Sequence, residues 1–483
     1  MTSINSAERH YTPPTYGNWW VPRTLGLGKL SLGQSFGLLA VAGVVFVVLL
    51  NGHLMAAFVV AVVSGLFFYL VTLTDRHRVS VAAKIGERAN FMIREWNGGN
   101  VFSRRSLSRP RLPGSLERTT ITAHTDSYDR PFAIIHHKGG TCTVVFSASP
   151  AASNLVDNID IDHQVAAWGM WLGDLGRMLN VVGAQVSVET LPDSGVRLKR
   201  EVEGRLHPSA SELSLDIISR IVSAYGIGAS QVRTHIALTF RDSKDSGYEI
   251  GIQLPSITNS LQATGAGTII PLGVDAVSRL SRCAFDPAAE EIFDAAFARR
   301  EETPLEWLEA GPQEARASWD SYRHDSGLSR SWVVSTPPQG TVTSDVLTHV
   351  LSPSGDIERK RVTLIYQTIS VDKAPGEIQK DLRWAKSRAV ANRGESIEDS
   401  LEYQAATQVA LERAKGAGLV NFGMIITGST MSDNPDEFRR MTHSIESLSA
   451  ASQLLVRPAY GRQEEAFIMA LPLGVLPKNG GWA

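Results

Sequence analysis

Two long apolar stretches lie near the start of the chain: LGQSFGLLAVAGVVFVVLL (residues 32–50) and LMAAFVVAVVSGLFFYLVTL (residues 54–73). Neither contains a Lys, Arg, Asp or Glu, and Asn51-Gly52-His53, a turn-favouring sequence, separates them. A helix of about 20 apolar residues crosses a bilayer core and satisfies its own backbone hydrogen bonds there. The pattern predicts a transmembrane helical hairpin over residues 32–73. The alternative is a helical pair buried inside a soluble domain.

Basic residues flank this hairpin on both sides, whereas its turn carries no fixed charge. Because Lys and Arg favour the cytoplasmic side, we expect a multi-pass protein of the inner (plasma) membrane with both termini in the cytoplasm. The apolar run starts too late and is too long for a secretory signal peptide. The flanking residues are Arg23 and Lys29 before the hairpin, and Arg76, Arg78, Lys84 and Arg88 after it.

The composition is that of a folded chain with room for two or three domains: 483 residues, 20% of them charged, with a net charge of −2. That balance does not favour direct nucleic-acid binding. The segment from residue 76 to residue 118 is an exception, because its nine Arg and one Lys against three Glu give it a charge of +7. Such a segment attracts anionic lipid headgroups. A solvated linker that only fixes the topology is the equal alternative.

The only two cysteines, Cys142 and Cys283, lie in apolar segments far apart in the sequence. Two isolated thiols predict neither a disulfide framework nor a cysteine-based metal site. We expect both to be buried and free in a reducing compartment, which agrees with a cytoplasmic body.

Local patterns divide the chain into segments. Residues 1–31 are a polar, aromatic cytoplasmic tail, and residues 74–113 form a basic juxtamembrane helix and linker. The helix is expected over residues 80–96, where Val81, Ile85, Met92 and Trp96 recur near helical spacing. The remainder reads as two α+β cytoplasmic domains, residues 114–300 and 331–483, joined by a polar interdomain segment over residues 301–330.

The first domain alternates β-branched runs with helical patterns, but without the short period of a doubly wound sheet. The second repeats a strand–helix–strand unit that favours a ferredoxin-like, split βαβ core. Strands are expected over 119–123, 132–136, 141–147, 181–190, 232–240, 332–335, 361–370, 419–428 and 453–457. Helices are expected over 163–179, 198–206, 212–225, 248–264, 274–282, 287–299, 344–351, 378–392, 396–415, 435–450 and 464–469.

Motifs for nucleotide or metal chemistry are absent from the sequence. Neither G-x-x-x-x-G-K-[ST], G-x-G-x-x-G nor H-E-x-x-H occurs, and Gly265-Ala266-Gly267-Thr268 lacks the lysine of a phosphate-binding loop. G-x-S-x-G occurs once, over residues 33–37, but it opens an apolar helix rather than following a strand, so we interpret it as a chance match. We therefore predict no cofactor, no catalytic residues and no metal ligands.

Four histidines and three aspartates are the best candidates for metal ligands in the sequence. His136 and His137 are neighbours on a strand, so their side chains should point to opposite faces, and neither His124 nor His163 stands at a recognisable ligand spacing from them. Three aspartates precede an expected helix, where carboxylates offset the positive helix terminus; a calcium loop would need a Gly and a terminal Glu that are missing. These aspartates are Asp157, Asp160 and Asp162.

The stretch SWDSYRHDS (residues 318–326) is the densest aromatic and polar cluster. It contains His324, Asp325 and Ser326, which would suit a membrane-anchored hydrolase. Residues of a catalytic triad, however, meet in space rather than in one contiguous segment. We favour an interdomain contact in which the aromatic rings are buried and the polar atoms bond loop backbone.

Eight stretches spread in order over the chain resemble a family of actinobacterial membrane proteins encoded beside conjugation-type (type IV secretion-like) ATPases and a small membrane partner. The second soluble domain also resembles the amino-terminal, non-motor domain of those ATPases, where an aromatic-x-x-x-x-Pro-x-Gly run like that over residues 467–474 precedes the nucleotide motif. The eight stretches are TYGNWWVPRTLGLGKLSL, LTDRHR, RPFAIIHH, VSVETLPDSGVRLKREV, SWDSYRHDS, RKRVTLIY, GAGLVNFGMIITGS and AYGRQEEAFIMALPLG.

The resemblance implies a non-enzymatic scaffold subunit of a conjugation or type IV secretion-like apparatus. Its expected partners are a secretion-type motor ATPase, a small membrane subunit of the same system, and membrane lipids through residues 76–118. Because the chain stops at Ala483, soon after the shared run, the expectation is the scaffold half without the motor. A type VII secretion membrane subunit and the membrane-anchored hydrolase are the alternatives.

Overall fold

The structure, a computed structural model, describes most of residues 32–65, 75–104, 111–150, 156–193, 202–226, 230–299, 301–338, 342–368 and 420–477, and a few positions within 379–407. Several expectations lie outside these residues. They are the tail over residues 1–31, the end of the second apolar stretch, and most of the helices expected over 198–206, 378–392 and 396–415.

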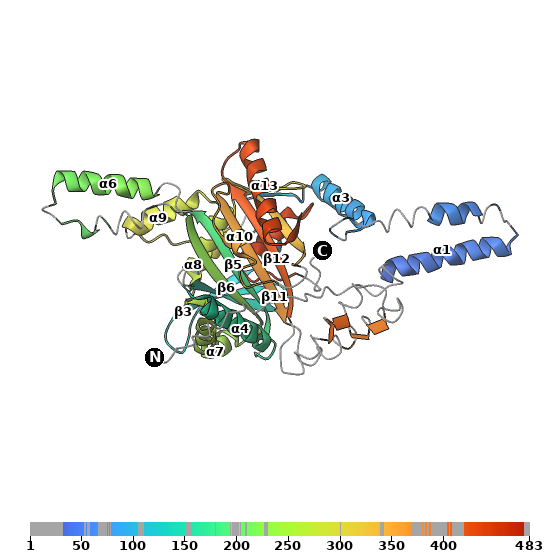
Figure 1. Ribbon diagram of the computed structural model, residues 1–483, viewed down its shortest axis with the longest axis horizontal. Helices are drawn as coiled ribbons and strands as arrows, with labels where there is room; N and C mark the ends of the chain where they lie inside the picture. The colour runs from blue at the N-terminus through green and yellow to red at the C-terminus, as the bar shows by residue number, and fades with distance from the viewer. Residues whose placement is uncertain are drawn as a thin grey trace, which may run out of the picture.

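The fold is mixed α+β and is built on one large antiparallel sheet (Figure 1). Its strand order is β1-β8-β9-β10-β12-β11-β5-β6-β4-β3-β2, with β13 added beside β10 and β7 beside β4. The strands are β1 (Val101–Ser103), β2 (Thr120–Thr125), β3 (Pro131–His137), β4 (Thr141–Ser149), β5 (Val181–Pro192), β6 (Ser230–Arg241), β7 (Thr268–Pro271), β8 (Glu314–Ala317), β9 (Tyr322–His324), β10 (Gly327–Thr336), β11 (Arg359–Thr368), β12 (Val420–Thr430) and β13 (Leu455–Pro458).

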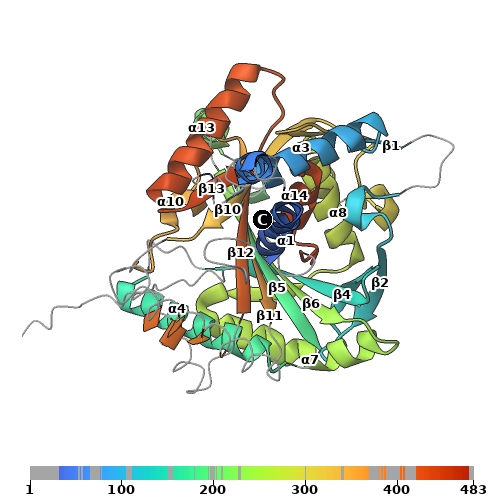
Figure 2. The same ribbon diagram turned by 90° about the vertical axis from the view of Figure 1, so that its right-hand side faces the viewer.

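The helices pack around this sheet, and Figure 2 shows α4 and α7 lying together along one side of it, away from α13. The helices are α1 (Leu32–Leu50), α3 (Val81–Trp96), α4 (Asn158–Leu175), α6 (Glu212–Gly226), α7 (Ser246–Leu261), α8 (Val274–Phe285), α9 (Ala289–Arg299), α10 (Thr348–Leu351), α13 (Pro435–Ala451) and α14 (Gln463–Ala470). Short helical turns are η1 (Gly114–Leu116), η3 (Gln262–Ala266) and η4 (Trp307–Glu309).

The sheet runs through both regions that the sequence suggested as domains. Strand β5 of the first region pairs with β11 of the second, from Thr190 opposite Lys360 to Gly183 opposite Gln367. Residues 301–330, expected as an interdomain segment, instead supply β8, β9 and the start of β10 to the same sheet. The residue pattern of a strand does not reveal which distant strand it pairs with. The sequence pattern therefore could not predict that the two regions share one sheet.

Apolar side chains fill both sides of the sheet. One cluster lies between β3, β4, β6 and helices α4 and α7, and includes Phe146, Trp171 and Leu254. A second cluster lies around α8 and α14, centred on Phe285, Tyr322 and Phe467, and a third packs α10 and α13 onto β10, β11 and β12. Full burial of such side chains stabilises a fold by about 1.5–3 kcal/mol each. The sheet, packed between these apolar clusters, is therefore a rigid support for the helices outside it.

Candidate membrane-facing surface

The apolar hairpin region lies at one end of the molecule, where α1 projects beyond the sheet (Figure 1). Large apolar side chains on α1 and on the helical stretch that follows it are exposed: Phe46 is 61% exposed and Met55 is 81% exposed. No helix among the residues described has both the length and the apolarity that crossing a bilayer requires. Contiguous apolar surface of this kind marks an interaction site.

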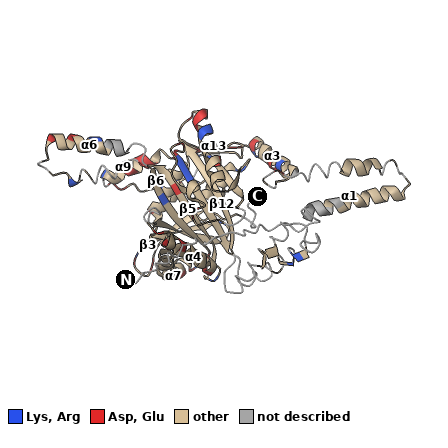
Figure 3. Ribbon diagram, in the orientation of Figure 1, with Lys and Arg blue, Asp and Glu red and all other residues tan. Residues whose placement is uncertain are grey.

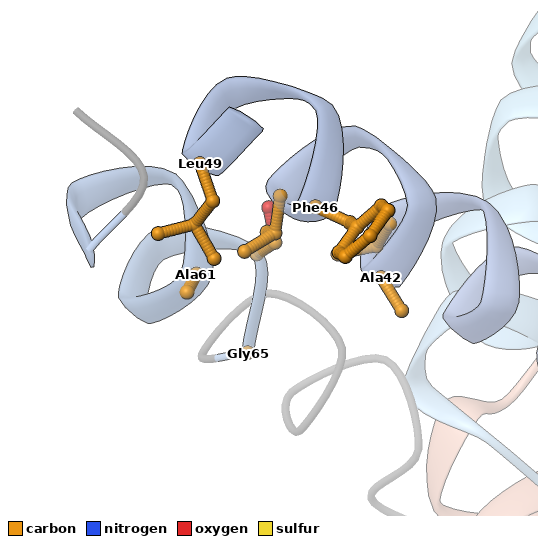
Figure 4. Close-up of a pocket in the computed structure, with 8 residues that line it drawn as sticks. Ala42, Phe46, Leu49, Ala61 and Gly65 are labelled. Carbon is orange, nitrogen blue, oxygen red and sulfur yellow. The ribbon is translucent and has the colours of Figure 1, made fainter. Parts of the chain in front are cut away.

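The two helical stretches of this region line one apolar pocket. The lining of this pocket includes Ala42, Phe46 and Leu49 of α1 on one side and Ala61 and Gly65 on the other (Figure 4). The G-x-S-x-G match over residues 33–37 lies inside α1, which agrees with its interpretation as a chance match rather than a strand-to-helix elbow.

Helix α3 connects this region to the body, and its sequence sets its limits. Ser80 caps its start by accepting a hydrogen bond from the Ala83 amide at 3.2 Å, and Gly98, with a φ of +66°, follows its end. The helix expected over residues 80–96 is thereby confirmed.

One face of α3 is docked on the sheet. Phe91 is buried edge-to-face against Trp319, with ring centroids 5.6 Å apart, and the guanidinium of Arg88 lies 4.5 Å from the same indole ring. A carboxylate oxygen of Glu87 accepts a hydrogen bond from Arg457 at 2.5 Å. These contacts hold α3 in a fixed orientation on the body.

The other face of α3 carries an apolar stripe. At 3.6 residues per turn, the four apolar residues expected from the sequence lie within about one-sixth of the helix circumference. All four are exposed, and Trp96 is 89% exposed. An outward apolar stripe on a helix is typical of helices that lie in a membrane interface. The stripe consists of Val81, Ile85, Met92 and Trp96.

Ion pairs within the molecule engage several basic residues of the 76–118 segment. They compete with any attraction of those residues to lipid, so the charge of +7 overstates the free positive charge of the segment. Figure 3 shows acidic and basic residues mixed over the body. The pairs are Lys84 with Asp75, Arg94 with Glu464 and Glu465, Arg104 with Glu309, and Arg111 with Glu117.

The histidines expected on opposite faces of β3 do contact different partners. His136 bonds Asp242 at 2.8 Å and Thr122 at 3.0 Å, whereas His137 bonds Thr143 at 3.0 Å. Burial lowers the pKa of His137 to about 4. His163 is exposed on α4. Within the described part of the chain, no three His, Cys, Asp or Glu side chains are grouped so that they could hold a metal ion.

The three aspartates lie at the start of α4, as expected for carboxylates near a helix N-terminus. Asp157 occupies the N-cap position, although its side chain makes no capping bond, and Asp160 is in the first turn. Both carboxylate oxygens of Asp162 are buried, with no hydrogen-bond partner among the described residues.

The residues of SWDSYRHDS point in different directions. His324 is fully buried between the Phe285 carbonyl oxygen (2.6 Å) and the Ser329 hydroxyl (2.7 Å), so it contacts neither of its neighbours suggested for a triad. Asp325 instead accepts the Gln313 and Glu314 amides at 2.8 and 2.9 Å, and the Ser326 hydroxyl donates to Asp286 at 2.6 Å. Asp325 and Ser326 thus bond loop groups, and the three side chains do not form a hydrolytic triad.

The two thiols are buried and free, as expected. Burial raises the pKa of Cys142 to about 12 and also raises the pKa of Cys283. Neither is therefore an activated nucleophile.

Sequence reasoning missed a buried ionic cluster in the middle of the sheet. Glu189 on β5 accepts hydrogen bonds from Arg359 at 2.8 Å and Arg361 at 2.6 Å, both on the paired strand β11. Arg359 also reaches Glu290 at 3.3 Å, and Arg233 donates to Glu290 at 2.6 Å. The signal was available: Arg359-Lys360-Arg361 places three charges at the start of a mostly apolar strand, and a buried Arg calls for an acidic partner.

A comparison with protein-family models finds no match to the chain, and a comparison with curated proteins finds none either.

Proposed function

We propose that this protein is an inner-membrane scaffold subunit of a conjugation or type IV secretion-like apparatus. Residues 32–73 insert as a hairpin with both termini in the cytoplasm, and the stripe of α3 lies on the inner leaflet. The observation that carries the proposal is the apolar surface shared by α1, the helical stretch after it and α3. A body docked on α3 is thereby held at a fixed orientation to the bilayer.

The partner in this proposal is a motor ATPase of the same system, assembled with a small membrane subunit. The chain's sequence holds no phosphate-binding loop, so the scaffold works without its own nucleotide site. The stretches quoted above support this assignment through their resemblance, as does the proposed ferredoxin-like relation of residues 331–483 to the non-motor domain of secretion ATPases.

Membrane insertion predicts a strong effect of charge within the hairpin. An Arg at the centre of a membrane helix costs about 2.5–3.5 kcal/mol, so Val44→Arg combined with Val59→Arg should cost about twice that amount. Both valines are exposed, so neither change disturbs a packed core. We expect at least a tenfold smaller fraction of the double variant in membranes after alkaline carbonate extraction. Val44→Leu with Val59→Leu is the control, and equal retention of both variants would contradict insertion.

The scaffold assignment predicts that affinity purification from solubilised membranes recovers a protein with a phosphate-binding loop of the secretion-ATPase kind. The matched control is the Arg double variant, which should lose that partner along with the membrane. Recovery of a lone, monodisperse monomer from wild-type membranes would count against the scaffold role. Recovery of small paired helical proteins would favour a type VII secretion subunit instead.

A further inference from the structure

Three side chains from separate parts of the chain form a row of hydrogen bonds near the edge of the sheet. A carboxylate oxygen of Asp242, which follows β6, lies 2.8 Å from Nδ1 of His136 on β3. Nε2 of the same imidazole lies 3.0 Å from the hydroxyl oxygen of Thr122 on the edge strand β2. This order of carboxylate, imidazole and hydroxyl is the arrangement that activates hydroxyl nucleophiles in acyl transfer.

The acid at the far end of the line is held as a carboxylate. Burial alone would raise the pKa of Asp242, but hydrogen bonds from His136 and Ser246 keep it below its ordinary value. The Ser246 hydroxyl donates to the second carboxylate oxygen at 3.0 Å, which fixes the orientation of Asp242. His136 therefore donates Nδ1–H to Asp242, and its Nε2 is left to accept the proton of Thr122.

A second imidazole contacts the same hydroxyl. Nε2 of His124 lies 2.9 Å from the Thr122 oxygen, and burial lowers the pKa of His124. If the Thr122 proton faces His136, the tautomer of His124 that fits this contact is the one that donates Nε2–H to the Thr122 oxygen. Its ring packs 5.7 Å from the ring of Phe132, and Gly247 leaves space for it: a Cβ there would lie 2.3 Å from the imidazole.

Thr122 is more exposed than its two partners, His136 and Asp242. Thr122 is exposed, whereas the side chains of His136 and Asp242 are only 26% and 24% exposed. Thr122 can therefore be reached from solvent, whereas the two residues behind it are mostly covered.

We propose that Thr122 is the nucleophile of an acyl-transfer site that accepts small activated carboxylic esters, with His136 as general base and Asp242 as its positioning residue. The Thr122 oxygen forms a bond to the carbonyl carbon of the ester, and its proton passes to Nε2 of His136. The bond to the leaving alkoxide then breaks, and His136 returns the proton to that oxygen. Water attacks the acyl-Thr122 ester by the reverse route and releases the carboxylic acid. The site is independent of the membrane role.

The test uses the full-length protein in nanodiscs with p-nitrophenyl acetate. We expect a burst of one equivalent of p-nitrophenolate per chain and an acetyl group on the peptide that contains Thr122. Thr122→Val should abolish the burst and Thr122→Ser should retain it. His136→Gln and Asp242→Asn should slow the burst by about 100-fold, within the range for loss of general-base catalysis.

Thr120→Val is the matched control, because it removes another exposed hydroxyl from the same strand. Circular dichroism of each variant checks that it is folded. Absence of a burst, or acetylation of Thr122 at the same rate in folded His136→Gln, would overturn the proposal, since the hydroxyl would then be an ordinary one.

Discussion

Acidification from pH 7 to pH 4 is expected to destabilise the folded body by several kcal/mol, because the body keeps histidines neutral in its interior. His324 is the clearest case: burial lowers its pKa to about 4, although the bond to the Phe285 carbonyl opposes that shift. Burial likewise lowers the pKa of His235 and of His137 to about 4. In the unfolded chain a histidine titrates near pH 6.5.

The sign follows from proton uptake. Between pH 6.5 and pH 4 the unfolded chain binds a proton at His324 and the folded chain does not, so stability falls as the pH falls through this window. Below pH 4 both states are protonated and the loss levels off. The difference between the folded and unfolded pKa values of His324 corresponds to a loss of about 3 kcal/mol in the free energy of unfolding.

Urea unfolding of the protein in nanodiscs at pH 7, 5.5 and 4, followed by tryptophan fluorescence, measures this loss. His324→Gln should lower stability at pH 7 but reduce the further loss on acidification. His443→Gln, at an exposed position on α13, is the control and should leave the pH dependence as it is in the wild type. An unchanged pH dependence in the His324→Gln variant would contradict the assignment.

Local pattern was sufficient to find most elements but not to assemble them. Strands β3, β6 and β12 begin and end within about two residues of the expected limits, since β-branched runs bounded by turn residues mark them. β8 and β9 were missed because they are short and polar. Their place in the sheet depends on pairing with each other and with β10, which no single strand reveals.

The candidate sites show the same division. The stripe of α3 could be predicted because helical spacing alone puts Val81, Ile85, Met92 and Trp96 on one side. The line from Asp242 through His136 to Thr122 could not, because Thr122 and His136 meet through the pairing of β2 with β3, and Asp242 joins them only after β6 is placed beside β4. The histidines attracted attention in the sequence, but their hydroxyl and carboxylate partners carried no signal there.

Removal of the Glu189 carboxylate is expected to be the most damaging single change in the sheet. Arg361 is buried and has Glu189 as its acidic partner, and burial lowers its pKa in spite of that partner. For Arg359, the charges of Glu189 and Glu290 outweigh burial and raise the pKa. Glu189→Gln would therefore leave Arg361 charged and uncompensated, at a cost of about 3–5 kcal/mol.

Glu189 also loses its contribution to stability on acidification, but in a lower pH window than the histidines. Although burial alone would raise its pKa, Arg359 and Arg361 lower it to about 2 in the folded protein, against an ordinary value of 4.5 for a Glu carboxyl. Its contribution is thus present above about pH 4.5 and is lost as the pH falls toward 2. Glu189→Gln should remove this part of the acid-induced loss of stability and leave the part between pH 6.5 and pH 4.

Urea unfolding at pH 7 of three variants measures the cost. Asp436→Asn makes the same acid-to-amide change in an exposed pair with Arg439 and should cost under about 1 kcal/mol. The double variant Glu189→Leu with Arg361→Met replaces the charges with apolar groups, and it should be more stable than Glu189→Gln, because no unpaired charge stays buried. If Glu189→Gln proved no costlier than Asp436→Asn, the ionic cluster would be open to water rather than buried in the sheet.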